Sequence, residues 1–139
     1  MESDVFVDSA GLYALADHRD PAWASAGRHV AEILRAGRRL VLTDYILDEA
    51  ATLAMARKGR QAALRLLEIP ELSQGFDFVW VGPERFGAAK TFFRKHADHG
   101  YSFTDCTSFV VMHELGLVDA LTTDRHFRQA GFKPLLPVA

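Results

Sequence analysis

Short runs of strand-forming residues alternate with longer helical segments along the whole chain, and this alternation is the feature that most constrains its fold. The strand-like runs are residues 4–8, 39–42, 76–81 and 119–123, with a last extended piece at residues 132–138. The helical segments include residues 22–36, 45–57, 84–97, 105–115 and 124–130, and a further helix follows Gly59 up to about Ser73. Because each strand reaches the next through a helix, the strands are expected to run parallel. We therefore predict an α/β fold whose central parallel sheet of four to five strands carries helices on both faces.

The length of 139 residues leaves room for one domain, residues 1–139, with a single core. Hydrophobic residues make up 49% of the chain and charged residues 24%, which are values of an ordinary globular protein. The longest unbroken apolar stretches, such as residues 78–81 and 109–112, are far shorter than the ~18 residues of a membrane helix. We expect a folded protein that does not span a membrane.

The first four residues include the acids Glu2 and Asp4 and no base, whereas a secretory signal opens with positive charge and a long apolar run. The lone cysteine, Cys106, excludes an internal disulfide and a thiolate zinc cluster, and it agrees with a reducing compartment. The expected location is the cytoplasm.

Four acidic residues lie near the carboxyl ends of the predicted strands, where an open parallel sheet binds its ligands. They are Asp8, Glu49, Asp105 and Asp124. Carboxylates brought close together raise one another's pKa, and a bound divalent cation removes that repulsion. Ligation by oxygen atoms alone is preferred by Mg²⁺ and Mn²⁺. The four acids together therefore predict a divalent metal site.

Each acid also has a simpler explanation. Asp8, Asp105 and Asp124 are placed where they can cap the helices that follow them. Glu49 lies too far into its helix to cap it, and a surface glutamate is its commonest alternative. Taken singly, the three aspartates are better explained as caps, whereas the presence of all four acids at one edge favours the metal site.

Four sequence blocks around these acids closely resemble PIN-domain ribonucleases, particularly the VapC-type toxins of prokaryotic toxin-antitoxin pairs. The blocks are VFVDSAGLYALAD, LVLTDYILDEAATL, YSFTDCTSFVVMHELGL and ALTTDRHF, and the resemblance covers essentially the whole chain. It implies that Asp8 and Asp105 are core ligands of Mg²⁺ or Mn²⁺, with Glu49 and Asp124 acting directly or through water. The implied activity is endonucleolytic cleavage of RNA by metal-activated water, leaving a 5′-phosphate and a 3′-hydroxyl. The resemblance also implies a cognate VapB-like antitoxin and a homodimer.

Several neighbouring residues are weaker candidates. The hydroxyls of Ser9, Thr104 and Thr123 adjoin proposed ligands and can bond to their carboxylates or to phosphate. Thr43 or Asp44 can cap the helix that follows the second strand, and Asp48 should point away from Glu49. Structural roles are favoured for the histidines in this region, His96, His99 and His113. Among the aromatic residues Tyr13, Trp23, Trp80 and Tyr101, only Tyr101 lies in the predicted rim loop, where it can stack on bases.

The charge distribution leaves two other functions open. The net charge is −2, yet residues 57–65 carry Arg57, Lys58, Arg60 and Arg65 without an acid. A catalytically idle PIN-like module can use that segment to hold RNA or a partner, although a solvated helix face is the simpler explanation of a charge run. A phosphoacceptor receiver domain is the other alternative. It requires paired acids near the first strand and a lysine after the last one, whereas Lys133 precedes Pro134 in the final extended piece.

Overall fold

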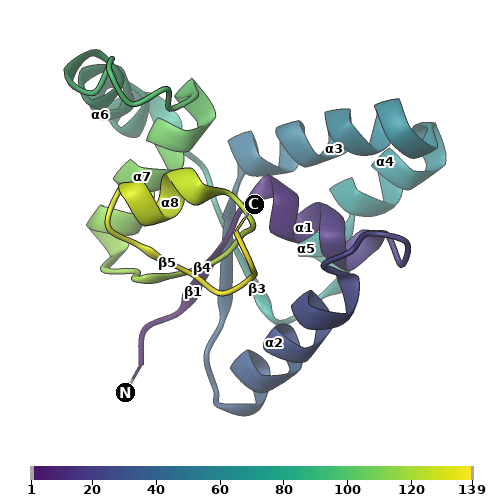
Figure 1. The fold of residues 1–139 in the computed structure, drawn as a ribbon. Coiled ribbons are helices and arrows are strands. Elements are labelled where there is room, and N and C mark those ends of the chain that lie inside the picture. Colours follow the sequence, from purple (N-terminus) through teal and green to yellow (C-terminus); the bar gives the residue numbers. More distant parts are fainter. Residues whose placement is uncertain (1, 139) are drawn as a thin grey trace.

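Five parallel strands form the centre of the molecule, in the spatial order β3-β2-β1-β4-β5 (Figure 1). The computed structural model describes residues 2–138, so Met1 and Ala139 of the expected domain lie outside the described residues. The strands are β1 (Val5–Val7), β2 (Leu40–Thr43), β3 (Phe76–Val79), β4 (Asp119–Leu121) and β5 (Lys133–Pro134). The predicted α/β class with a parallel sheet is confirmed.

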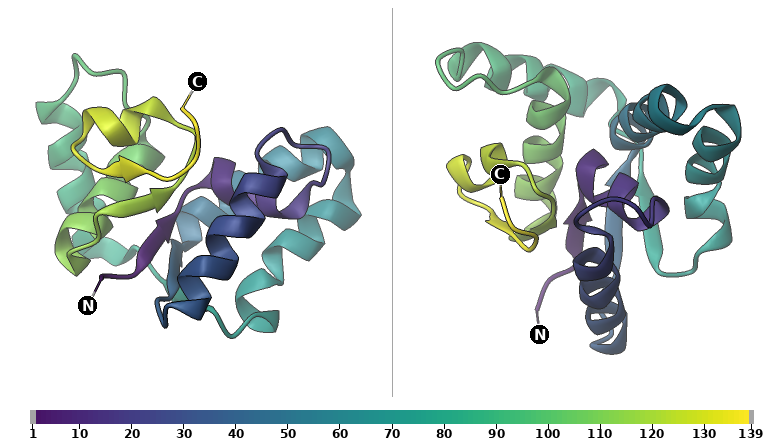
Figure 2. Two further views of the ribbon diagram at one scale, coloured as in Figure 1. Left: turned by 60° about the horizontal axis from the view of Figure 1, so that its bottom comes forward. Right: turned by 45° about the vertical axis from the view of Figure 1, so that its right-hand side comes forward.

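Helices cover both faces of the sheet (Figure 2). One side carries α1 (Ser9–Ala16), α2 (Trp23–Arg35), α3 (Asp44–Lys58), α4 (Arg60–Leu67) and α5 (Ile69–Leu72). The other side carries α6 (Gly82–Lys95), α7 (Phe103–Leu115) and α8 (Arg125–Gln129). Because both faces are covered, the central strand β1 is apolar throughout, and Val5, Phe6 and Val7 are fully buried. None of the helices within residues 2–138 is long and apolar enough to cross a membrane.

The predicted boundaries differ from the observed ones where caps and prolines decide them. The helix expected at residues 105–115 begins earlier, at Phe103, because Ser102 caps it. The helix expected at residues 84–97 begins at Gly82 and ends at Lys95, with Pro83 in its first turn. The single helix expected after Gly59 is two helices, and the second has Pro70 in its first turn.

The last extended piece, expected at residues 132–138, contributes only Lys133 and Pro134 to the sheet. These two residues pair with Asp119 and Ala120 of β4. Since proline has no N–H to donate, its place in the edge strand β5 is the position that a sheet tolerates.

Because all the strands are parallel, their carboxyl ends meet at one edge of the sheet. The residues that directly follow β1, β2 and β4 are Asp8, Asp44 and Thr122. This edge is where the fold places side chains that can act together.

Close packing of α1 on β4 fixes the helix that follows Asp8, and it yields a test of the fold. A Cβ atom on Gly11 would lie 2.0 Å from the backbone oxygen of Leu121. Gly11→Ala should therefore lower the free energy of unfolding by at least ~1–3 kcal/mol, as measured by chemical denaturation. The matched control is Gly27→Ala in α2, where a Cβ would meet no atom within 4 Å. That variant should gain roughly 0.5–1 kcal/mol, because alanine is the better helix residue. Equal effects of the two substitutions would contradict the packing of α1 on β4.

Candidate metal centre

Asp8 is a buried carboxylate at the junction of β1 and α1. It occupies the N-cap position of α1, yet its side chain makes no capping hydrogen bond. Its Oδ2 instead accepts a hydrogen bond of 2.7 Å from the Thr122 hydroxyl, and the residue is only 4% exposed. The cap explanation therefore fails for Asp8, and its carboxylate is held for another purpose.

Thr122 connects Asp8 to Asp124. Besides donating to Asp8, the buried Thr122 hydroxyl accepts a hydrogen bond of 2.9 Å from the backbone N–H of Asp124. Asp124 in turn caps α8, since its Oδ1 accepts from the backbone N–H of His126 at 2.9 Å. The cap predicted as an alternative for Asp124 is thus present, and the same network places this acid beside Asp8.

Asp105 lies inside the first turn of α7, in a capping box with Ser102. The backbone N–H of Ser102 donates to Asp105 Oδ2, and the backbone N–H of Asp105 donates to Ser102 Oγ, each at 3.0 Å. His126 Nδ1 lies 3.2 Å from Asp105 Oδ2 and 3.4 Å from Asp124 Oδ1. One possible ligand atom from each of Asp105, Asp124 and His126 lies within 4.8 Å of the others.

Glu49 reaches the same edge from the second turn of α3. The Ser9 hydroxyl donates a short hydrogen bond to Glu49 Oε1, and Ser9 Oγ also lies 3.5 Å from Asp8 Oδ1. The structure therefore links all four predicted acids through Ser9, Thr122 and His126.

Burial and the charges of neighbouring acids raise the pKa of two of the four acids. Burial raises the pKa of Asp8 to about 7, against opposing hydrogen bonds from Thr122 and Ser9, and the charges of Asp105 and Asp124 add to the rise. Burial also raises the pKa of Asp105, and the nearby charge of Asp124 contributes. Within residues 2–138, no lysine or arginine nitrogen lies within 4 Å of the four acids, and the imidazole of His126 is the basic side chain that reaches them.

This donor set fits a divalent cation. Its carboxylate oxygens are hard ligands of the kind that Mg²⁺ and Mn²⁺ prefer, and a cation would relieve the cost of burying Asp8 and Asp105. His126 adds one nitrogen that can either ligate or orient the carboxylates.

Two residues of the network carry no predicted role. The sequence analysis singles out Thr123, whereas Thr122 makes the bonds to Asp8 and Asp124. The direction of its buried side chain depends on how the backbone turns just after β4, and residue types alone do not reveal that turn. His126 lies within the TTDRHF motif, and that position was the available signal. Ser9 does bond to a carboxylate as expected, while the side-chain hydrogen bonds at Thr104 are those that its backbone oxygen accepts from the hydroxyls of Thr107 and Ser108.

The expectation that Tyr101 stacks on bases is wrong. Its ring is 7% exposed, and it packs edge-on against Phe109 at 5.1 Å and His126 at 5.5 Å. It therefore supports His126 from the interior. His96 and His113 have the structural roles expected of them, stacking on Phe92 and contacting Phe132. Asp44 does not cap α3, since Thr43 does, and it accepts instead from the N–H of Val81.

The receiver alternative fails on position. Lys133 pairs with Asp119 at the start of β4, which is the amino end of the strands, away from Asp8. Glu2 forms an ion pair with Arg38, and Asp4 accepts from the backbone N–H of Arg39. The residues that a receiver domain requires therefore lie at the wrong end of the sheet.

The raised pKa of Asp8 predicts how apo stability depends on pH. The folded state keeps a proton on Asp8 up to about pH 7, whereas the ordinary aspartate pKa is 3.8. The native state then binds more protons between about pH 4 and 7, so its free energy of unfolding should fall as pH rises through this window. Asp8→Asn should flatten that dependence in chelator-treated protein, measured by denaturant titrations. Asp48→Asn, at an exposed position of α3 next to Glu49 in the sequence, should keep the wild-type slope. A wild-type slope in Asp8→Asn would contradict the buried, protonated state of Asp8.

Comparisons with known proteins agree with this geometry. Residues 5–133 match the PIN domain family. The 23S rRNA-specific endonuclease VapC20 of Mycobacterium tuberculosis is 31% identical over 134 residues, which cover 96% of this chain and 98% of the relative. The crystal structure of VapC20, described as a sarcin-ricin loop cleaving toxin, matches with a TM-score of 0.84 and 29% identity, over 96% of this chain and 100% of that one.

A second crystal structure, that of PAE2754 from Pyrobaculum aerophilum, shares the fold. Its TM-score is 0.59 at 24% identity, over 97% of this chain and 91% of that one. The match to the family and the identity to VapC20 over nearly the whole length confirm the resemblance seen in the four acidic blocks. The chain therefore belongs to the PIN-domain family of ribonucleases, as a protein of the VapC type.

Proposed function

We propose that this protein is a divalent-metal-dependent endoribonuclease and the toxin of a toxin-antitoxin pair. The observation that carries the proposal is the hydrogen-bonded cluster of Asp8, Glu49, Asp105 and Asp124 at one edge of the sheet, in which two of the acids are buried. A catalytically idle module has no need to maintain buried carboxylates against repulsion, so the cluster argues for activity.

Asp8 and Asp105 would hold Mg²⁺ or Mn²⁺ directly, and Glu49 and Asp124 would act directly or through water. The metal would lower the pKa of a water molecule and neutralise charge on the phosphate. The protein's own part is to orient the ligands. Thr122 fixes the Asp8 carboxylate, and Ser9 fixes that of Glu49.

His126 completes this orientation on the other side of the cluster. Its Nδ1, when it carries the proton, donates toward Asp105 and Asp124. The ring of Tyr101 packs edge-on against the imidazole and limits its rotation. Such a framework sets the carboxylates before the substrate arrives, which reduces the reorganisation needed during cleavage.

The substrate class follows from the relative. VapC20 is named as specific for 23S rRNA, and its structure as that of a sarcin-ricin loop cleaving toxin. We infer that this protein also cleaves a ribosomal RNA stem-loop, leaving a 5′-phosphate and a 3′-hydroxyl. It would do so in the cytoplasm.

A VapB-like antitoxin would restrain the activity, and the protein would form a homodimer. An apolar surface supports association with another protein chain. Leu72 is 77% exposed and Trp80 69% exposed. Leu67, Pro70, Phe78 and Trp80 line a hollow of about 380 Å³ beside Leu47. Exposed apolar patches of this kind mark protein interfaces more often than free surface.

Cleavage assays on purified ribosomes and on a 23S rRNA fragment test the proposal. Wild type should cleave with Mg²⁺ or Mn²⁺ and lose activity in chelator, with recovery when the metal is restored. Asp105→Asn and Glu49→Gln should each lower the cleavage rate by more than ~100-fold, since even residues that only support metal ligands typically contribute 10–100-fold.

The matched control is Asp48→Asn, which removes the same charge next to Glu49 but outside the hydrogen-bonded cluster. It should cleave at close to the wild-type rate. Full activity of Asp105→Asn, or metal-independent cleavage by wild type, would rule out the proposed chemistry.

A further inference from the structure

The contact between α1 and α3 leads away from the acidic cluster toward a basic surface. It begins where Ser9 bonds to Glu49. One turn further along α1, the Arg57 guanidinium lies over the ring of Tyr13, 5.0 Å from the centroid of that ring. Arg57 lies eight residues after Glu49, or roughly 12 Å along α3 at 1.5 Å per residue. The helices α1 and α3, which position Asp8 and Glu49, therefore also connect the acidic cluster to this surface.

A small pocket lies at the end of this path, between the ends of α1 and α3 and the helix α4. Its volume is about 140 Å³. Ala54, Ala62 and Leu66 form apolar walls beside Tyr13, and the charged Lys58 and Arg65 line it as well. Pockets for drug-sized molecules measure roughly 300–1,000 Å³, so this one has room for a single flat ring.

The surroundings of the pocket are strongly positive, although the whole chain has a net charge of −2. Arg57, Lys58, Arg60 and Arg65 are all exposed. Within residues 2–138, no carboxylate oxygen lies within 4 Å of the three arginines. Unpaired cations around a concave site attract phosphate.

Asp17 also lines this pocket, and its carboxylate already has partners within the protein. Its carboxylate accepts from the Tyr13 hydroxyl at 2.7 Å and from the backbone N–H of Arg19, and Lys58 Nζ lies 3.4 Å away. The hydrogen bonds from Tyr13 and Arg19 hold its pKa below the ordinary value. It therefore stays charged and structural, and its ion pair is with Lys58 rather than with Arg57 or Arg65.

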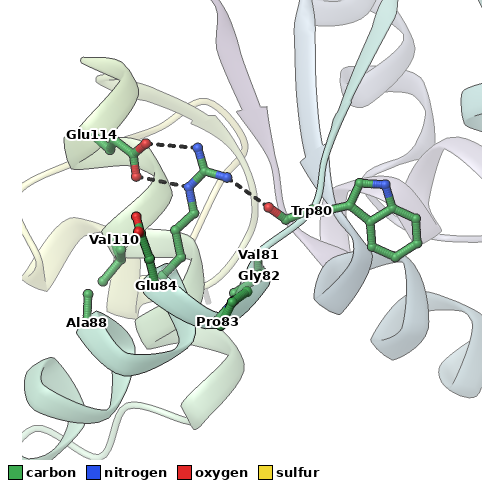
Figure 3. A pocket seen from close by; sticks show the side chains of 9 residues that line it. Trp80, Val81, Gly82, Pro83, Glu84, Ala88, Val110 and Glu114 are labelled. Atoms are coloured by element: carbon green, nitrogen blue, oxygen red, sulfur yellow. Dashed lines mark hydrogen bonds and ion pairs between the residues drawn. The ribbon is translucent and has the colours of Figure 1, made fainter.

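A larger hollow between α6 and α7 differs in this respect (Figure 3). It measures about 620 Å³, but its arginine is already bound within the protein. Arg85 makes two bonds to Glu114, at 2.8 and 2.9 Å, and a third to the backbone oxygen of Trp80. That hollow has no free cation to offer a phosphate.

We propose that the pocket between α1, α3 and α4 is a nucleotide subsite for the RNA strand. One base enters the mouth of the pocket beside Ala16 and Ala62. Its phosphate binds Arg65, next to the Lys58 ammonium that faces Asp17, while Arg57 guides the strand from the acidic cluster. Asp17 lies nine residues after Asp8, or roughly 14 Å along α1. At roughly 3.4 Å per stacked nucleotide, the bound base is about four nucleotides from the cleaved bond.

The inference rests on the proposed ribonuclease function and adds a second place, besides the acidic cluster, at which the protein holds the RNA strand.

The test measures the affinity of the protein for a labelled, mixed-sequence single-stranded RNA at several salt concentrations, by fluorescence anisotropy. All proteins carry Asp105→Asn so that the RNA stays intact. Lys58→Gln with Arg65→Gln should lower the slope of log affinity against log salt by about 0.7, since the two side chains face one phosphate and each neutralised phosphate accounts for roughly 0.7.

Ala62→Leu separates the base from the phosphate, because it fills the pocket without changing charge. It should weaken binding about tenfold, the loss of one stacked base, and leave the salt slope unchanged. The matched control is Lys90→Gln with Arg94→Gln, which removes the same charge from exposed positions of α6 on the other side of the sheet. It should bind RNA as the parent does, and thermal unfolding should show that every variant is folded.

Wild-type affinity and slope in Lys58→Gln with Arg65→Gln, or wild-type affinity in Ala62→Leu, would overturn the subsite. If those variants bind RNA normally but lose affinity for the antitoxin, the pocket belongs to the antitoxin interface instead, and the subsite is also wrong. A protein that cleaves RNA but shows these results refutes only the subsite. Absence of both cleavage by the wild-type protein and RNA binding by the Asp105→Asn parent would refute the ribonuclease function itself.

Discussion

The hydrogen bond from Thr122 to Asp8 is the interaction on which the site depends. It joins the carboxyl ends of the neighbouring strands β1 and β4, and it does so with a carboxylate that is almost completely removed from water. Such a bond only partly offsets the desolvation of Asp8, whose pKa is still raised to about 7. The fold therefore maintains a buried acid whose ionisation is unfavourable at one edge of the sheet, and the chemistry follows from that acid.

The rest of the architecture holds this edge in place. Gly11 lets α1 approach the backbone of β4, which fixes the direction in which Asp8 and Ser9 point. The capping box of α7 positions Asp105, and the cap of α8 positions Asp124. Ordinary helix-ending devices thus serve two purposes here, since the acids that stabilise helix termini are also the acids of the proposed metal site.

Much of this arrangement could be predicted from the sequence because parallel strands end at one edge. The alternation of strands and helices predicted the sheet, and the positions of Asp8, Glu49, Asp105 and Asp124 predicted that they would meet. The roles of Thr122 and His126 depend on side-chain directions just after a strand, which residue types do not determine. Burial of Tyr101 depends on its packing against Phe109, and the polar loop around it suggested exposure instead. Helix boundaries shifted where Ser102 and Pro83 set them.

The central claim is that the buried acids exist to hold a divalent cation, and metal-linked stability tests it most directly. Denaturant unfolding of chelator-treated protein should be measured across a titration of Mn²⁺ and, separately, of Mg²⁺. Wild type should gain about 2.7 kcal/mol in the free energy of unfolding when the free metal reaches ~100 times its Kd, because the ion binds the folded state alone. Asp8→Asn should gain much less while folding normally without metal. Equal stabilisation of wild type and Asp8→Asn would contradict the account.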